Sequence, residues 1–161
     1  MRGATLFAAG LVVGVTAQAL VAQNANTGVV MMNHVGINVP SIPDAIKYYA
    51  DTMGYKEAFR ANNPDGTPRL VYLQISKTTF LELQQSGGQR PAGFTHYGLH
   101  VENTKAAVEM FRGRGATVSE PNVSNDTKAV LANITDPYMG RIELAELPAD
   151  SLQRKAIDSW K

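Results

Sequence analysis

The stretch His34-Val35-Gly36-Ile37-Asn38-Val39 recurs later in the chain as His96-Tyr97-Gly98-Leu99-His100-Val101, so the pattern His-x-Gly-[Ile/Leu]-x-Val occurs twice. A second pair of matching stretches follows, Phe80-Leu81-Glu82-Leu83 and Arg141-Ile142-Glu143-Leu144. The two histidines are 62 residues apart and the two glutamates are 61 residues apart. Two matches at nearly the same period predict a duplicated unit of about 60 residues, each with one His and one Glu.

Composition is that of an ordinary globular protein. The 161 residues are enough for one domain, and 44% apolar with 18% charged residues is typical of a chain that buries a core. The net charge is +1 and the basic residues are scattered, which argues against nucleic acid as a partner. Cysteine is absent, so any metal must be held by nitrogen and oxygen ligands.

The N-terminus (residues 1–22) has the pattern of an export signal. A positive residue precedes an almost uninterrupted apolar run over residues 4–15, and small residues follow. We expect cleavage after Ala22, with Ala19 as the second choice, and a flexible mature start over residues 23–31. The alternative is an uncleaved anchor, but the run is shorter than the roughly 20 apolar residues that span a bilayer. We therefore expect an exported protein, periplasmic in a bacterium, without stable membrane insertion.

The rest of the chain is predicted to form two βαβββ units. The first covers residues 32–86 and the second residues 94–147, and together they make one α+β domain followed by a C-terminal helix or tail at residues 148–161. Helices are expected between Ser41 and Gly54 and from Asn103 to Gly113. The expected strands are residues 33–39, 55–60, 70–75 and 79–84, then 96–101, 116–119, 128–134 and 141–145.

Strand alternation gives the repeat two faces. Side chains two residues apart share a face, so His34, Gly36 and Asn38 lie opposite the apolar residues between them. The apolar face packs on the helix of its unit, and the polar face then lines the concave side of the sheet. By the same argument that side also carries Phe80, Glu82, Gln84, His96, Gly98, His100, Arg141, Glu143 and Ala145. The glycines between the polar residues would leave room for a ligand.

An approximate twofold relation between the units would direct His34, Glu82, His96 and Glu143 at one place. Imidazole and carboxylate ligands suit one divalent ion such as Ni, Zn, Co, Mn or Fe. An octahedral ion with four protein ligands keeps two positions for water or substrate, and acts as a Lewis acid. The alternative is that each residue is an ordinary polar residue on a solvated sheet face. The matching register of His with His and of Glu with Glu favours the metal site.

At these residues the chain resembles the vicinal oxygen chelate superfamily, and within it glyoxalase I, from about Met32 to Leu147. The family's opening pattern is a metal-binding His followed by a helix with Ala-Ile-x-Tyr-Tyr and Met-Gly-Tyr, matched here by residues 45–49 and 53–55. Its closing pattern, with Asp-Pro, Gly and Ile-Glu-Leu, is matched by residues 136–144. Glu82 stands where glyoxalase I has its first metal glutamate.

The resemblance implies a cup-shaped mixed sheet, one divalent metal ion, and a homodimer whose sites take ligands from both subunits. It also implies a metal-dependent lyase or isomerase that acts on a 2-oxoaldehyde–thiol adduct or a related oxygen-chelating small molecule. Glu143 or Glu82 would be the catalytic residue that shuttles a proton. Asn38 stands where glyoxalase I has an Arg for the glutathione carboxylate, which counts against glutathione recognition.

Four residues on the cup face are expected to bind substrate: Asn38, Gln84, His100 and Arg141. His100 has Asn38 as its counterpart in the first unit, so we expect it to line the cavity and not to be a fifth metal ligand. Two alternatives stay open. One is a ligand-sequestering module that resembles bleomycin-resistance proteins and needs no metal. The other is an iron-dependent extradiol dioxygenase, in which Glu82 would be surplus.

Overall fold

Eight strands form a single mixed sheet in the computed structural model, which describes residues 28–161. The expected export signal and its cleavage sites lie outside these residues. The sheet order is β2-β3-β4-β1-β5-β8-β7-β6. In chain order the strands are β1 Val29–Val39, β2 Lys56–Asn62, β3 Pro68–Ser76, β4 Thr79–Gln85, β5 Gly93–Val101, β6 Asn122–Val123, β7 Val130–Asp136 and β8 Gly140–Glu146. The helices are α2 Ile42–Lys47, the π-helix η1 Tyr48–Thr52, α3 Thr104–Gly113 and α4 Leu152–Asp158.

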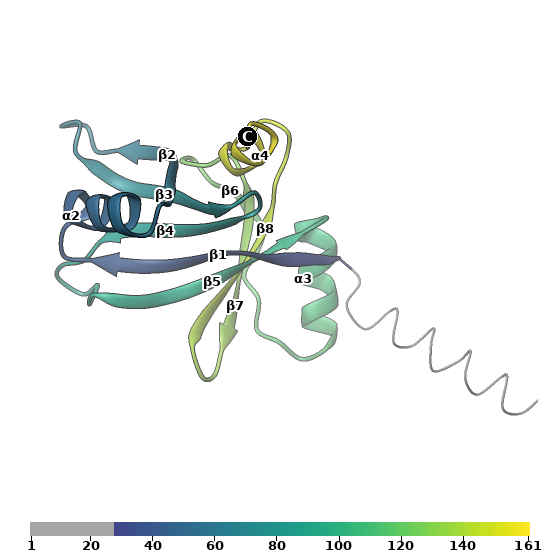
Figure 1. Ribbon diagram of the computed structural model, residues 1–161. Helices are drawn as coiled ribbons and strands as arrows, with labels where there is room; N and C mark the ends of the chain where they lie inside the picture. The colour runs from purple at the N-terminus through teal and green to yellow at the C-terminus, as the bar shows by residue number, and fades with distance from the viewer. Residues whose placement is uncertain (1–27) are drawn as a thin grey trace, which may run out of the picture.

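The two predicted units are related by the strand pairing. β1 runs parallel to β4 in the first unit, as β5 runs parallel to β8 in the second. The units join where β1 and β5 pair antiparallel through the middle of the sheet (Figure 1). In that pairing His34 lies opposite Gly98 and Gly36 lies opposite His96. The predicted α+β cup built from two βαβββ units is therefore confirmed.

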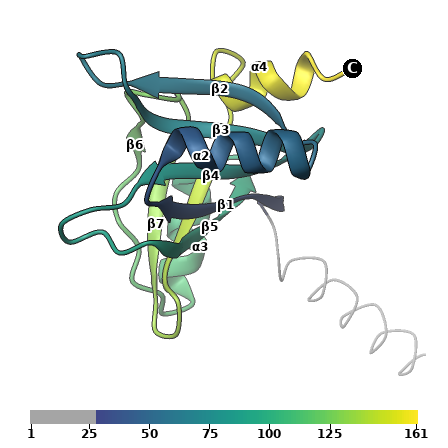
Figure 2. The ribbon, with the colours of Figure 1, turned by 60° about the vertical axis from the view of Figure 1, so that its left-hand side comes forward.

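Helices α2 and α3 cover the outer face of the sheet. Ser41 begins α2 by accepting a hydrogen bond from the Asp44 amide, and Asn103 begins α3 by accepting one from the Ala106 amide. α2 lies across β3 and β4 (Figure 2), where Ile42 packs in an apolar cluster with residues of those strands. Within residues 28–161, none of the helices has the length and apolar character needed to cross a membrane.

Helix α4 packs on the inner face of the sheet. Its Ala156 and Ile157 belong to one apolar cluster with Tyr72 and Phe80, whose side chains share the face of Glu82. The sequence predicts that this helix packs on the body, as it does. It does not predict that the helix fills part of the cup, because helical periodicity shows an apolar face but not its partner.

Three local predictions need correction. β1 begins at Val29, so residues 29–31 of the segment expected to be flexible pair with β5. The strand expected at 116–119 is reduced to one bridge between Val118 and Ile134, and the pairing resumes at β6 after Pro121, which has no amide hydrogen to donate. The first helix widens into a π-helix from Tyr48 onward.

Candidate metal centre

The four central strands each bring one buried side chain to the same place. His34 comes from β1, Glu82 from β4, His96 from β5 and Glu143 from β8, and one ligand atom from each lies within 4.8 Å of the others. His34 Nε2 lies 3.1 Å from His96 Nε2, 3.5 Å from Glu82 Oε2 and 3.4 Å from Glu143 Oε1. Two imidazole nitrogens and two carboxylate oxygens converging in a buried space fit the ligand set of a divalent ion.

All four side chains belong to one chain. Within this chain β1 pairs with β5, which places the first His opposite the second unit. The expected interface site, with ligands taken from both subunits, stays a prediction.

The glycines of the two repeats leave space for the imidazole rings. A Cβ added at Gly98 would lie 2.0 Å from His34 Cε1, and one added at Gly36 would lie 2.1 Å from His96 Cε1. Each glycine thus leaves space for the histidine of the other unit. The expectation that these glycines make room for a ligand is wrong, because the rings fill that space. The reciprocal arrangement follows from the twofold relation of the two repeats.

Polar residues just before each histidine hold the rings. Asn33 Oδ1 lies 3.0 Å from His34 Nδ1, and Thr95 Oγ1 lies 2.8 Å from His96 Nδ1. When Nδ1 carries the ring proton and donates it outward, Nε2 keeps its lone pair for a metal. The sequence prediction missed both residues. The signal was present, since Asn33 and Thr95 occupy the same position of the repeat.

The two carboxylates are held unequally. Tyr72 Oη donates to Glu82 Oε2 at 2.5 Å, and Gln84 Nε2 donates to Glu82 Oε1 at 2.5 Å. Glu143 has longer contacts, with His34 and with Arg141 Nη1 at 3.7 Å. Glu82 is therefore fixed at both oxygens, and Glu143 has more freedom to move. Sequence reasoning missed Tyr72, which lies directly opposite Glu82 in the β3–β4 pairing.

The charges of the cluster perturb its titration. Burial raises the pKa of Glu82, but hydrogen bonding to His96 and the imidazole charges outweigh it and lower the pKa to about 2. Burial lowers the pKa of His34, but the hydrogen bond to Glu143 and the nearby carboxylate charges outweigh it, so this pKa is raised. Burial and the same carboxylates raise the pKa of Tyr72 well above its usual value, so Tyr72 stays a donor.

The structure separates the four residues expected to bind substrate. Gln84 and Arg141 line a cavity of about 130 Å³ beside Glu82 and Glu143. Asn38 does not line it and donates to the Pro91 carbonyl at 3.1 Å, which holds the linker between the units.

His100 also lies outside the lining of this cavity and is half-buried. Burial and the charge of Arg154 on α4 lower the pKa of His100. Arg154 of α4 thus lies near enough to His100 for its charge to act on the imidazole.

A cup of two βαβββ units with paired buried His and Glu side chains defines the class of this protein. The chain belongs to the Glyoxalase/Bleomycin resistance protein/Dioxygenase superfamily, whose family model matches residues 33–130. It is similar to a probable chloroplastic lactoylglutathione lyase of Arabidopsis thaliana, with 29% identity over 123 residues that cover 71% of this chain. The match spans only 35% of that longer protein.

Solved structures support the fold. A methylmalonyl-CoA epimerase of Mycobacterium tuberculosis superposes with a TM-score of 0.65 at 21% identity, over 76% of this chain and 91% of the epimerase. A protein of Bacillus halodurans C-125 superposes with a TM-score of 0.60 at 21% identity, over 71% of this chain and 92% of that protein.

Proposed function

We propose that this protein is a divalent-metal-dependent, glyoxalase I-like lyase or isomerase that acts on a small oxygen-chelating substrate. The observation that carries the proposal is the buried set of His34, Glu82, His96 and Glu143. Burying two carboxylates beside two imidazoles is costly unless a partner compensates their charge. A divalent ion compensates both carboxylates. Similarity to a probable lactoylglutathione lyase supports the reaction class.

When bound, the ion supplies Lewis-acid polarisation of two neighbouring substrate oxygens. The protein supplies the base. Glu143 is the better candidate because it lines the cavity and is free of short hydrogen bonds, whereas Glu82 is fixed by Tyr72 and Gln84. Glu143 takes a proton from the substrate carbon and returns it to the neighbouring carbon, so no co-reactant is needed. Glu82 remains in place as a ligand.

The alternatives fit the cluster less well. A ligand-sequestering module without metal leaves four buried ionisable groups without a role. An extradiol dioxygenase needs two histidines and one carboxylate, and Glu82 would be a surplus fourth donor although two residues hold it in position.

Solvent deuterium exchange tests the proposal. Metal-loaded protein is incubated in deuterated water with methylglyoxal and a thiol, and both the rate of product formation and the deuterium content of the product are measured. We expect Glu143→Gln to retain most of the metal but lose proton transfer by at least about 100-fold, the size of a general-base contribution. Glu109→Gln changes an exposed glutamate of α3 and is the control. Equal activity of Glu143→Gln and wild type would refute the assignment.

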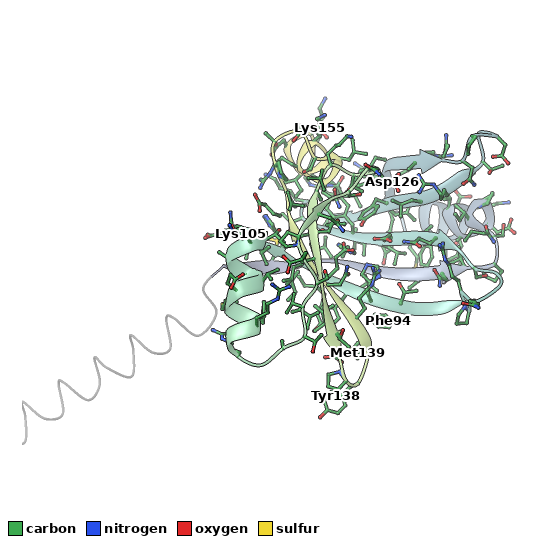
Figure 3. All side chains as sticks on the ribbon, turned by 180° about the vertical axis from the view of Figure 1, so that it is seen from behind. Phe94, Lys105, Asp126, Tyr138, Met139 and Lys155 are labelled. Atoms are coloured by element: carbon green, nitrogen blue, oxygen red, sulfur yellow. The ribbon has the colours of Figure 1, made fainter. Side chains whose placement is uncertain are left out.

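The homodimer and the export of the mature chain remain proposals. Three exposed apolar residues, Phe94, Tyr138 and Met139, lie on one side of the molecule at the end opposite α4 (Figure 3), and offer a surface for self-association. Sedimentation of the chain lacking residues 1–22 tests the dimer, with Tyr138→Ser as the weakening variant. Fractionation of cells that express the full chain tests export.

A further inference from the structure

The two halves of the cup differ beside the metal centre. Strand positions two residues before Glu82 and Glu143 correspond in the repeat, and they carry Phe80 and Arg141. Phe80 is fully buried and packs with Tyr72 and with α4. The side chain of Arg141 keeps 39% of its surface exposed. The apolar helix thus closes the first half, and access to the centre is left on the side of Arg141.

The space beside Arg141 is small, and contacts from both units and α4 hold part of its lining. The cavity of about 130 Å³ is well below the roughly 300–1,000 Å³ that holds drug-sized ligands. Part of its lining comes from the loop that carries Asp126 and Thr127. Arg69 of the first unit binds Asp126 through two contacts of 2.6 and 2.9 Å, and the Leu152 amide of α4 donates to the Thr127 carbonyl at 2.8 Å. Figure 3 shows Asp126 between α4 and the strands of the first unit.

Charge also distinguishes this space. A divalent ion would cancel the charges of Glu82 and Glu143, and Arg69 already pairs with Asp126. Arg141 then keeps a positive charge beside the cavity that no neighbouring negative charge fully balances. Its oxygen contacts among residues 28–161 are Asn133 Oδ1 at 3.4 Å and Glu143 Oε2 at 3.7 Å, both longer than a good hydrogen bond.

The short contact of Arg141 also depends on the state of His96. Arg141 Nη2 lies 2.7 Å from His96 Nδ1, which can accept only if the ring proton is on Nε2. Metal binding through Nε2 requires the other tautomer, with Nδ1–H donating to Thr95 Oγ1. In that tautomer the guanidinium loses its acceptor, and a planar carboxylate of the substrate is the group that its paired N–H donors fit.

We propose that the substrate of this centre is a small carboxylic acid with an oxygen on the neighbouring carbon, and that Arg141 binds its carboxylate. This inference deepens the proposed function and rests on it for the role of the metal. The small volume of the cavity favours a compact acid over a bulky glutathione adduct. Glu143 lies beside the same guanidinium, where a proton next to the chelating oxygens would be within its reach.

Calorimetric titration with matched probes tests the proposal. Pyruvate carries a carboxylate next to a carbonyl. Butane-2,3-dione has its heavy atoms in the same arrangement but carries no charge. The metal-loaded full chain is expected to bind pyruvate at least about 10-fold more tightly than the diketone, because a hydrogen bond to a charged group contributes that much. The glutathione adduct of methylglyoxal is expected not to bind.

Variants test whether the preference for pyruvate depends on the Arg141 guanidinium. Arg141→Gln should reduce the preference for pyruvate, and Arg141→Lys should reduce it less, because lysine retains the positive charge but not the paired N–H donors. Arg60→Gln, an exposed arginine on β2, should leave the preference unchanged. Equal binding of both probes by wild type, tight binding of the glutathione adduct, or an unchanged preference in Arg141→Gln would overturn the proposal.

Metal content measured on the same samples distinguishes a failure of the proposed function from a failure of the inference about Arg141. Wild-type protein without metal refutes the proposed function, whereas metal-loaded protein without carboxylate preference refutes only the inference. Chelator-treated protein that still prefers pyruvate through Arg141 supports the anchor without the metal.

Discussion

Adding one methyl group at Gly98 should disable the proposed metal centre while the fold survives. The new Cβ would lie 2.0 Å from His34 Cε1, 2.4 Å from Nδ1 and 2.6 Å from Nε2. Ordinary contacts of this kind are 3.4–4 Å, so the ring must move by more than 1 Å. His34 is fully buried, and the strain stays in the core.

Two magnitudes follow for Gly98→Ala. Overpacking of this kind costs roughly 1–3 kcal/mol, which for a domain of this size lowers Tm by about 2–10 °C. Metal sites tolerate ligand displacements of only about 0.2 Å, so displacement of His34 removes one ligand in effect. We expect metal affinity to fall by about 100-fold or more, beyond the effect of altering an outer contact.

The assay is competition with a chelator of known affinity, alongside thermal unfolding of the metal-free protein. Gly36→Ala should behave alike, because its Cβ would meet His96 in the same way. Gly113→Ala adds the same methyl at the end of α3, where nothing lies within 4 Å, and is the matched control. Wild-type metal affinity in Gly98→Ala with an unchanged fold would refute the reasoning that the glycines seat the ligands.

Three further outcomes follow from the same geometry. Metal affinity should fall as the pH decreases, and the fall should begin above the usual imidazole pKa of 6.5. The pKa of His34 is raised, so a proton competes with the metal for this ring in that range, whereas Glu82, with a pKa of about 2, stays ionised. Chelator competition from about pH 5.5 to 8.5 checks this, and a flat profile would contradict it. Tyr72→Phe removes the hydrogen bond to Glu82 and should weaken metal binding by about 10-fold in the same assay, with an unchanged affinity as the contrary result. Gln153→Met should raise the free energy of unfolding, measured by urea denaturation, by about 1 kcal/mol. The reason is that the buried Gln153 amide has no hydrogen-bond partner within residues 28–161. Destabilisation by this substitution would show that the amide is hydrogen-bonded.

The duplicated strand explains why so much of the site was predictable. Side chains in a strand alternate with period two, and a repeat fixes corresponding positions, so His34 and His96 had to face the same side. The pairing partner of each glutamate was also implied by the hairpins. Asn33 and Thr95 could have been found by comparing the residues that precede each histidine.

Other features depend on contacts between distant segments. Nothing in residues 148–161 says that Ala156 and Ile157 pack inside the cup and not on its outer surface. The role of Gly98 depends on the register between β1 and β5, which hydrogen bonding across the two units sets. Asn38 has the position of a cavity residue by alternation, yet its amide is used by the linker carbonyl of Pro91.

Metal content of the purified chain tests the central claim most directly. Wild-type protein loaded with a single divalent metal and dialysed should retain about one ion per chain, because each chain supplies all four ligands. His34→Ala and Glu143→Ala should each lose it, whereas His100→Ala should keep it because His100 lies outside the cluster. Wild-type protein without stoichiometric metal, or His34→Ala and Glu143→Ala proteins that retain it, would contradict the account.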